Sequence, residues 1–262
     1  MKMTPSTKKH GFLILTLIAA TAFGACAGSR NTANMTMKER IAYAKKKFDE
    51  GDYFEAKTQF QILVLNNPGS SIVDVAQYYL AESYFQSKEY ITAAAEFEKL
   101  VTIYPHSEYR DDAQFKLAKC YFELSPPSQL DQEYTIKAID LYQLFLEEYP
   151  NSEHVKEAEA DLQACREKLA KKEFETGEQY KKRQYYISAI ISFEEVLARY
   201  YDTSYVDDAL YWKAYSHYQL GEYREARDAL QLLLNKYPDS PLRSKAVKLG
   251  TQVDQAMSSN QS

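Results

Sequence analysis

From Lys38 almost to its end, the chain carries apolar residues at the spacing of one face of an α-helix. In five segments a small Ala is followed four residues later by a large apolar side chain and three residues after that by another, as in Ala56, Phe60 and Leu63. The other four segments begin at Ala93, Ala138, Ala189 and Ala226. Four of the five end at a Pro, which cannot continue a helix, and Tyr201 takes that place in the fourth. The pattern predicts five amphipathic helices.

A second set of small residues predicts a partner helix before each of these five. The small residues are Ala44, Ala81, Ala118, Gly177 and Ala214, and each lies twelve positions before the Ala of its segment except Ala118, which precedes an inserted loop. Small residues that face one another let two helices cross closely. We therefore expect an antiparallel helix pair that is repeated five times.

Near-copies of one ten-residue phrase, "YPHSEYRDDA" at 104–113, separate the pairs. The copies occupy 67–76, 149–158, 200–209 and 237–246. We interpret the phrase as the loop between pairs, with its Ser or Thr as a helix cap. A small residue, then Tyr, then Ala–x–x–x–Phe, then Pro is the pattern of the tetratricopeptide repeat. A single pair cannot bury its apolar face, so neighbouring pairs must stack.

The predicted fold is therefore an all-α tetratricopeptide-repeat solenoid over 38–262, with five helix pairs and a C-terminal capping helix at 241–257. The expected repeats span 38–68, 74–105, 111–150, 156–201 and 207–238. Two of them depart from the plan. The third carries the longer loop "SPPSQLDQE" (125–133), and the stretch 152–183 before the fourth is typical of one extended helix whose charges face solvent.

The first 25 residues are typical of a secretory signal. Three Lys precede the apolar run "FLILTLIAATAF" (12–23), which is too short to span a membrane as a helix. The next residues, "FGAC", resemble the lipobox of bacterial lipoproteins, although Phe23 stands where Leu is usual. We expect residues 1–25 to be removed, Cys26 to be lipidated, and residues 26–37 to form a flexible tether. The same resemblance implies the outer membrane, because the residue after the Cys is Ala27, whereas lipoproteins of the inner membrane often carry Asp there.

Charge and motifs narrow the function. Loss of residues 1–25 leaves 29 basic and 37 acidic residues, which argues against nucleic acid as a partner. The sequence has no His pair or CxxC at metal-ligand spacing, no phosphate-binding loop and no catalytic constellation, so we predict no metal, no cofactor and no enzymatic activity. Cys120 and Cys165 lie at equivalent positions of neighbouring repeats; buried free thiols are the default expectation, with a disulfide as the alternative.

The candidate binding surface follows from the repeat pattern, because the first helices of such repeats line a concave face. The residues three before and four after each small position share that face. In the first three repeats these are Ile41, Phe48, Tyr78, Phe85, Phe115 and Phe122. The fifth repeat supplies Tyr211, Tyr215 and Tyr218 as candidates for binding a partner. These aromatics favour a groove for an extended peptide, with core packing as an equally weighted alternative.

The irregular parts of the chain resemble the BamD family, the lipoproteins of the bacterial β-barrel assembly machinery. The likeness is strongest in "LDQEYTIKAIDLYQLFLEEYP" (130–150), "REKLAKKEFETGEQYKKR" (166–183) and "YYISAIISFEEVLARYYDTSYVDDAL" (185–210). The resemblance implies a lipid-anchored protein on the periplasmic side of the outer membrane. It also implies binding to the periplasmic domains of BamA and to other assembly subunits, and recognition of unfolded outer-membrane proteins.

Two other functions remain open on the sequence. One is a repeat lipoprotein that serves as a scaffold for cell-envelope or cell-wall machinery. The other is a glycan-capture lipoprotein, although sugar stacking often uses Trp and the chain has only Trp212.

Overall fold

The computed structural model describes residues 34–70 and 72–259, and these residues are helical with no β-strand. The helices in chain order are α2 (Met37–Asp49), α3 (Tyr53–Asn66), α4 (Val73–Gln86), α5 (Tyr90–Ile103), α6 (Arg110–Leu124), α7 (Glu133–Glu148), α8 (Val155–Lys182), α9 (Tyr186–Arg199), α10 (Val206–Leu220), α11 (Tyr223–Lys236) and α12 (Arg243–Ser259). The expected signal peptide, Cys26 and most of the tether lie outside the described residues. Within the described ranges, no helix is both long and apolar enough to cross a membrane.

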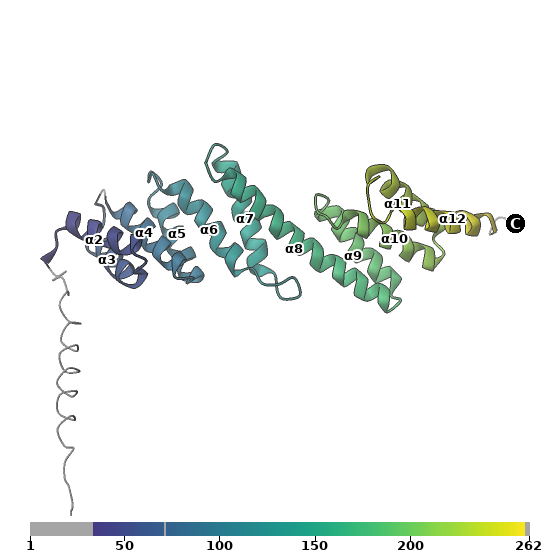
Figure 1. Ribbon diagram of the computed structural model, residues 1–262, viewed down its shortest axis with the longest axis horizontal. Helices are drawn as coiled ribbons and strands as arrows, with labels where there is room; N and C mark the ends of the chain where they lie inside the picture. Colours follow the sequence, from purple (N-terminus) through teal and green to yellow (C-terminus); the bar gives the residue numbers. More distant parts are fainter. Residues whose placement is uncertain (1–33, 71, 260–262) are drawn as a thin grey trace, which may run out of the picture.

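The helices stack in pairs along one axis and form an elongated solenoid (Figure 1). Each helix packs on the next one in the chain, and the first helices of some neighbouring pairs also touch, as α2 touches α4 and α6 touches α8. Helix α12 closes the last pair by packing on α11 and α10. The prediction of an all-α repeat solenoid with five helix pairs and a capping helix is confirmed.

The small residues lie where the two helices of each pair cross. Ala44 and Ala56, for example, are both fully buried in one cluster with Phe60. Gly177 lies at a close crossing of α8 and α9: a Cβ placed on it would lie 2.6 Å from Cε1 of Phe193. This site therefore has no room for a side chain unless the ring moves.

The expected extended helix is confirmed as α8, of 28 residues. Its buried side chains divide between two cores. Cys165 and Leu169 pack with residues of α6 and α7, whereas Phe174 packs with Phe193 and Val196 of α9. Helix α8 thus belongs to two neighbouring repeats, and Figure 1 shows it running diagonally between the two halves of the molecule.

The prediction that Ser or Thr of the repeated phrase caps the following helix is wrong. The N-cap residues are Ile72, Tyr109, His154 and Tyr205, and none of them makes a side-chain cap. The Ser instead lies two residues earlier and accepts a backbone N–H within the turn, as Ser107 Oγ does from Tyr109 (3.2 Å) and Ser240 Oγ from Leu242 (3.1 Å). Such Ser turns set the path of the loop, which explains why the phrase recurs.

Cys120 and Cys165 are free and buried, as the default expectation had it. They belong to different core clusters, the first with α5 and the second with α7. Burial raises the pKa of the Cys165 thiol to about 11 and raises that of Cys120 further. Both groups are therefore protonated at neutral pH and serve as small core side chains.

Candidate protein-interaction surface

The predicted groove residues fall into two groups by burial. Five of them are half-buried on the first helices: Ile41, Phe48, Tyr78, Phe85 and Phe122. Phe115 is only 2% exposed, because it packs against Tyr142 and Phe145 and lies flat against the ring of His154. Phe115 is therefore a core residue and not part of a groove, which corrects the sequence-based prediction.

The half-buried rings of the first two pairs form a contiguous aromatic surface across α2 and α4. Phe48 meets Tyr53 and Tyr79 edge-on, with ring centroids 5.5 Å apart in each case. Tyr78 stacks on Tyr109, the residue that precedes α6, at 4.6 Å. We call Phe48, Tyr78, Tyr79 and Tyr109 the N-terminal aromatic surface. Its rings support one another and still keep part of each side chain open to solvent.

Burial raises the pKa of Tyr78, Tyr79 and Tyr109. These phenols therefore stay neutral at physiological pH and present ring faces and hydroxyl groups to a ligand. Lys45 places its ammonium group 4.4 Å from the centre of the Tyr79 ring, which adds one positive charge at the edge of the surface.

Lysines cover the rings farther along the first helices. Lys116 Nζ lies 3.1 Å from Glu82 Oε1 and 4.7 Å from the centre of the Phe85 ring. Lys119 Nζ lies 2.6 Å from Asp161 Oδ2 and 5.0 Å from the centre of the Phe122 ring. Phe85 and Phe122 thus lie next to charged groups that tie α4 to α6 and α6 to α8.

Sequence reasoning missed Tyr79 and the three lysines. Glu82 pairs with Lys116 of the next first helix, and Lys119 pairs with Asp161. The charged residue that directly follows the small residue in four repeats (Lys45, Glu82, Lys119 and Glu178) therefore did not point to these pairs.

The aromatic residues of the fifth pair form a second cluster on α10. Trp212 lies between Tyr211 and Tyr215, with ring centroids 4.9 and 5.6 Å away. Tyr211 is 8% exposed and belongs to the core, which corrects its assignment as a binding residue, whereas Tyr215 and Tyr218 are half-buried. Lys181 of α8 lies over the Trp212 ring, with Nζ 3.0 Å from its centre, and burial lowers the pKa of this lysine.

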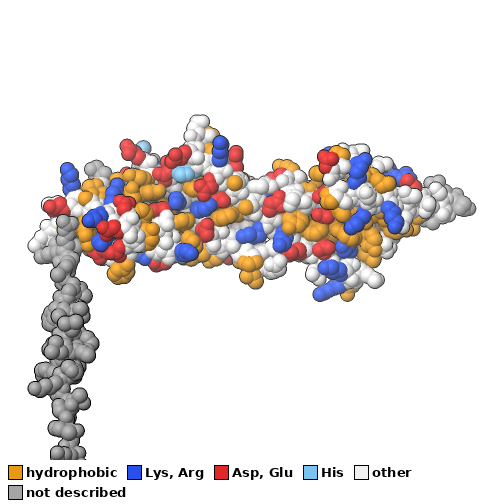
Figure 2. Space-filling view, in the orientation of Figure 1, with side chains coloured by type: hydrophobic (Ala, Val, Ile, Leu, Met, Phe, Trp, Pro, Cys, Tyr) orange, Lys and Arg blue, Asp and Glu red, His pale blue; other side chains and the backbone are white. Residues whose placement is uncertain are grey.

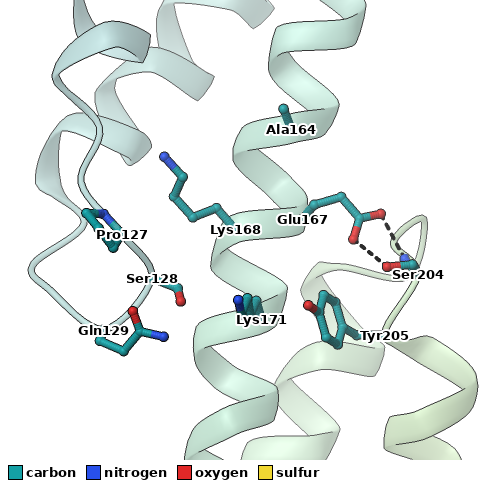
Figure 3. A pocket seen from close by; sticks show the side chains of 9 residues that line it. All are labelled: Pro127, Ser128, Gln129, Ala164, Glu167, Lys168, Lys171, Ser204 and Tyr205. Atoms are coloured by element: carbon teal, nitrogen blue, oxygen red, sulfur yellow. Dashed lines mark hydrogen bonds between the residues drawn. The ribbon is translucent and has the colours of Figure 1, made fainter.

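A pocket of about 380 Å³ lies where the inserted loop of the third repeat faces α8 (Figure 3). Pro127, Ser128 and Gln129 form one side, Lys168 and Lys171 project from α8, and Ser204 with Tyr205 closes the other side. Most of its polar groups already have protein partners. Lys168 donates to Ser125 Oγ at 2.6 Å, and Gln129 donates to Glu175 at 3.0 Å. The contacts hold the inserted loop on α8.

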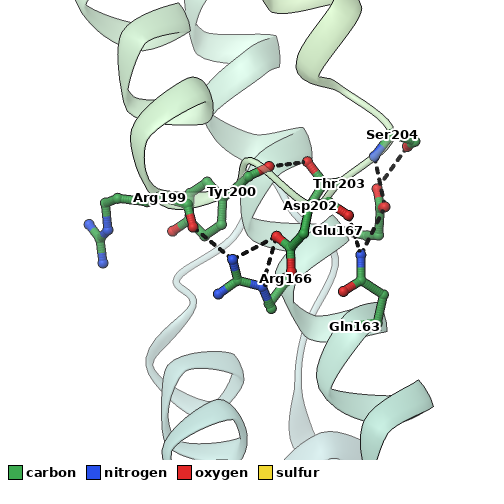
Figure 4. Close-up of polar contacts among 8 residues, drawn as sticks. All are labelled: Gln163, Arg166, Glu167, Arg199, Tyr200, Asp202, Thr203 and Ser204. Atoms are coloured by element: carbon green, nitrogen blue, oxygen red, sulfur yellow. Dashed lines mark hydrogen bonds and ion pairs between the residues drawn. The ribbon is translucent and has the colours of Figure 1, made fainter. Parts of the chain in front are cut away.

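Helix α8 also fixes the loop between α9 and α10 (Figure 4). Arg166 forms a two-pronged ion pair with Asp202, with Nη2 2.6 Å from Oδ1 and Nε 2.8 Å from Oδ2, and donates to the carbonyl of Arg199. Glu167 accepts from both the backbone and the hydroxyl of Ser204, each at 2.8 Å. The hydrogen bonds from Arg166 hold the pKa of Asp202 below its usual range. No pattern in the sequence pointed to this junction.

Charged side chains of both signs are interspersed with apolar ones over the face shown in Figure 2. That face therefore carries no broad field of one sign that would steer a strongly charged ligand.

Comparison with known proteins agrees with the repeat architecture and shows the family. The model of a family described as an outer membrane lipoprotein, YfiO, matches residues 33–222, which is most of the chain. The chain belongs to this family of outer membrane lipoproteins. A tetratricopeptide-repeat model separately matches residues 208–240, the fifth helix pair.

Curated relatives of this lipoprotein include two that are named outer membrane protein assembly factor BamD. The protein from Rickettsia prowazekii is 30% identical over 119 residues, which cover 45% of this chain and 47% of the relative. The protein from Neisseria meningitidis serogroup A is 28% identical over 110 residues, which cover 41% of each chain. The chain therefore spans about half or less of the length of the curated relatives it matches.

Solved structures similar to the lipoprotein include other repeat proteins. The complex of the TPR2AB domain of yeast Sti1 with pHSP90 gives a TM-score of 0.43 at 15% identity, covering 84% of each chain. A thermophilic TPR protein of Thermus thermophilus gives 0.36 at 17% identity, covering 85% of this chain and 99% of that one.

Proposed function

We propose that this lipoprotein is a non-enzymatic scaffold of the β-barrel assembly machinery, anchored by lipid on Cys26 to the outer membrane and facing the periplasm. Its partners are the periplasmic domains of BamA, other subunits of the machinery, and unfolded outer-membrane proteins. The observation that carries the proposal is the family match over 33–222, together with relatives that bear the name BamD.

The N-terminal aromatic surface is the proposed site for unfolded clients. Outer-membrane β-strands alternate apolar and polar side chains, so an extended client segment presents a row of aromatic and aliphatic groups on one side. Phe48, Tyr78 and Tyr79 offer ring faces to such a row at low cost in conformational entropy. The half-buried Tyr215 and Tyr218 of the fifth pair are the proposed contacts for a folded partner.

The proposed mechanism is non-covalent. A lipid on Cys26 and the short tether that follows would keep the solenoid near the membrane. Two partners that bind the same rigid body then meet at a high effective concentration, so assembly is favoured without a chemical step.

Single substitutions test the client site. Phe48→Ala removes the ring that the surface contributes from α2 and is expected to weaken the binding of a barrel-strand peptide by about five- to tenfold, which is the usual effect of deleting one aromatic contact at an interface. Binding is measured by fluorescence anisotropy with a labelled peptide.

The matched control is Phe54→Ala, since Phe54 is an aromatic residue on α3 that is 79% exposed and lies outside the surface. Helix content and melting temperature are recorded for both variants, so that a folding defect is recognised. Equal peptide affinity in the wild type and in Phe48→Ala would refute the client site. Failure of the lipoprotein to co-purify with any barrel-assembly subunit from membranes would refute the wider proposal.

A further inference from the structure

Three side chains that can bind a metal ion meet where the third helix pair joins α8. Asp112 lies in the first turn of α6, while Glu153 and His154 lie in the loop that leads into α8. Their ligand atoms all lie within 4.8 Å of one another, and His154 Nε2 is 2.7 Å from Asp112 Oδ1. The residues come from two copies of the repeated phrase, so no local spacing motif in the sequence announces them.

The imidazole is held in place before any ion binds. Its ring lies flat on the buried ring of Phe115, with centroids 4.5 Å apart and planes 3° apart. The backbone N–H of His154 donates to Ser152 Oγ at 3.3 Å, and that hydroxyl lies 3.2 Å from Asp111 Oδ2. The side chains of His154 and Asp112 are 21% and 29% exposed, so the pair lies near the surface and is not enclosed in the core.

Glu153 differs from the other two residues. It is exposed, and among the described residues its carboxylate makes neither an ion pair nor a hydrogen bond. Such a carboxylate can move toward a bound metal ion without breaking any hydrogen bond or ion pair. It therefore supplies the mobile third ligand beside two preformed ones.

We propose that Asp112, Glu153 and His154 form a Zn²⁺ site that joins α6 to the start of α8. One imidazole nitrogen and two carboxylate oxygens suit Zn²⁺, whereas Mg²⁺ and Ca²⁺ prefer oxygen ligands alone. Tetrahedral bonds of about 2.0–2.2 Å place neighbouring ligand atoms roughly 3.3 Å apart. His154 Nε2 and Asp112 Oδ1 are 2.7 Å apart, and no two of the ligand atoms are more than 4.8 Å apart, so small side-chain rotations complete the site.

The ion binds the lone pair of Nε2 of the neutral imidazole and so takes the place of a proton there, and the single ring proton of His154 then lies on Nδ1. Three protein ligands leave the fourth position to water or to a group of a bound partner. The site would also join residues that lie 42 positions apart in the chain. Zn²⁺ therefore binds the folded state in preference to the unfolded one and stabilises the contact between α6 and α8.

Calorimetric titration of ZnCl₂ into the chelator-treated protein, purified in detergent, tests the proposal. We expect one equivalent of Zn²⁺ to bind and to raise the melting temperature, and MgCl₂ to do neither. His154→Gln and Glu153→Gln are each expected to weaken Zn²⁺ binding by about tenfold or more and to reduce the rise in melting temperature.

Glu153→Gln is the decisive variant, because the Glu153 carboxylate is exposed and makes no hydrogen bond or ion pair with the described residues, so the substitution should leave the fold unchanged. The matched control is His106→Gln, since His106 is exposed in the corresponding loop one repeat earlier and lies outside the cluster. It should bind Zn²⁺ as the wild type does. Unchanged Zn²⁺ affinity in Glu153→Gln, or an equal loss in His106→Gln, would overturn the proposal.

Discussion

The close crossing at Gly177 gives a sharp test of how the helix pairs are built. Gly177→Ala improves the intrinsic helix propensity of α8 by about 1 kcal/mol. The new methyl group would lie 2.6 Å from Phe193 Cε1 and 2.9 Å from Cδ1, and Phe193 is fully buried. Overpacking of a core costs about 1–3 kcal/mol. We therefore expect the variant to be less stable than the wild type by as much as about 2 kcal/mol, despite its better helix propensity.

Gly250→Ala supplies the control. Gly250 also lies inside a helix, α12, but the nearest atom to its added Cβ is Leu230 Cδ1 at 4.0 Å, an ordinary van der Waals contact. The propensity gain is the same and the clash is absent, so this variant should be more stable by about 0.5–1 kcal/mol. The two variants should thus differ by about 1–3 kcal/mol, or several degrees in melting temperature.

Urea and thermal unfolding, followed by circular dichroism, measure both variants under the same conditions. The reasoning is wrong if Gly177→Ala gains as much stability as Gly250→Ala. That result would mean that the Phe193 ring yields freely and that the small residue is not needed for the crossing.

Two further predictions concern titration and reactivity. The pKa of Asp202 is lower in the folded state because of Arg166, so the ion pair stabilises the fold above the unfolded pKa of about 4, and this stability is lost as the pH falls through the folded pKa. Asp202→Asn should therefore make the free energy of unfolding less dependent on pH below about pH 4. An unchanged pH dependence would show that the Arg166–Asp202 pair does not lower this pKa. At about pH 8, Cys120 and Cys165 should react with a thiol reagent only at the rate at which the protein unfolds locally, because burial raises the pKa of both thiols. Fast labelling of either thiol in the native protein would show that its core is open to the reagent.

The helix pairs were predictable because sterics leave few choices at a crossing. A small residue such as Ala44 or Gly177 has to lie where two backbones approach, and Ala56 or Phe193 has to face it. The spacing of these residues predicts both helices of a pair, and the Pro at the end of most pairs predicts where the second helix ends. The same regularity revealed the longer loop of the third pair, since residues had to be inserted between Ala118 and the next helix.

The groove was harder to predict because periodicity places a residue on a face without showing what covers that face. Phe115 is covered by His154 from the following loop, while Phe48, another aromatic of a first helix, remains half-buried. The helix-cap prediction failed for a related reason. Ser107 has the composition of a cap, but its position two residues before the N-cap makes it a turn residue.

The length of α8 bears on how the two aromatic clusters can act. The first helices of the other pairs have 13 to 15 residues, and α8 has 28. At a rise of about 1.5 Å per residue, the additional residues make α8 about 20 Å longer than the other first helices, and α9 packs on the added part. The core follows this division, since Cys165 and Leu169 pack with the third pair and Phe174 with the fourth.

The N-terminal aromatic surface, on the first two helix pairs, and the aromatic cluster around Trp212, on the fifth, therefore lie on opposite sides of α8 along the solenoid (Figure 1). A client at the first cluster and a folded partner at the second would not compete for the same side chains. This arrangement favours a scaffold that holds two polypeptides at once over a groove that encloses a single long peptide.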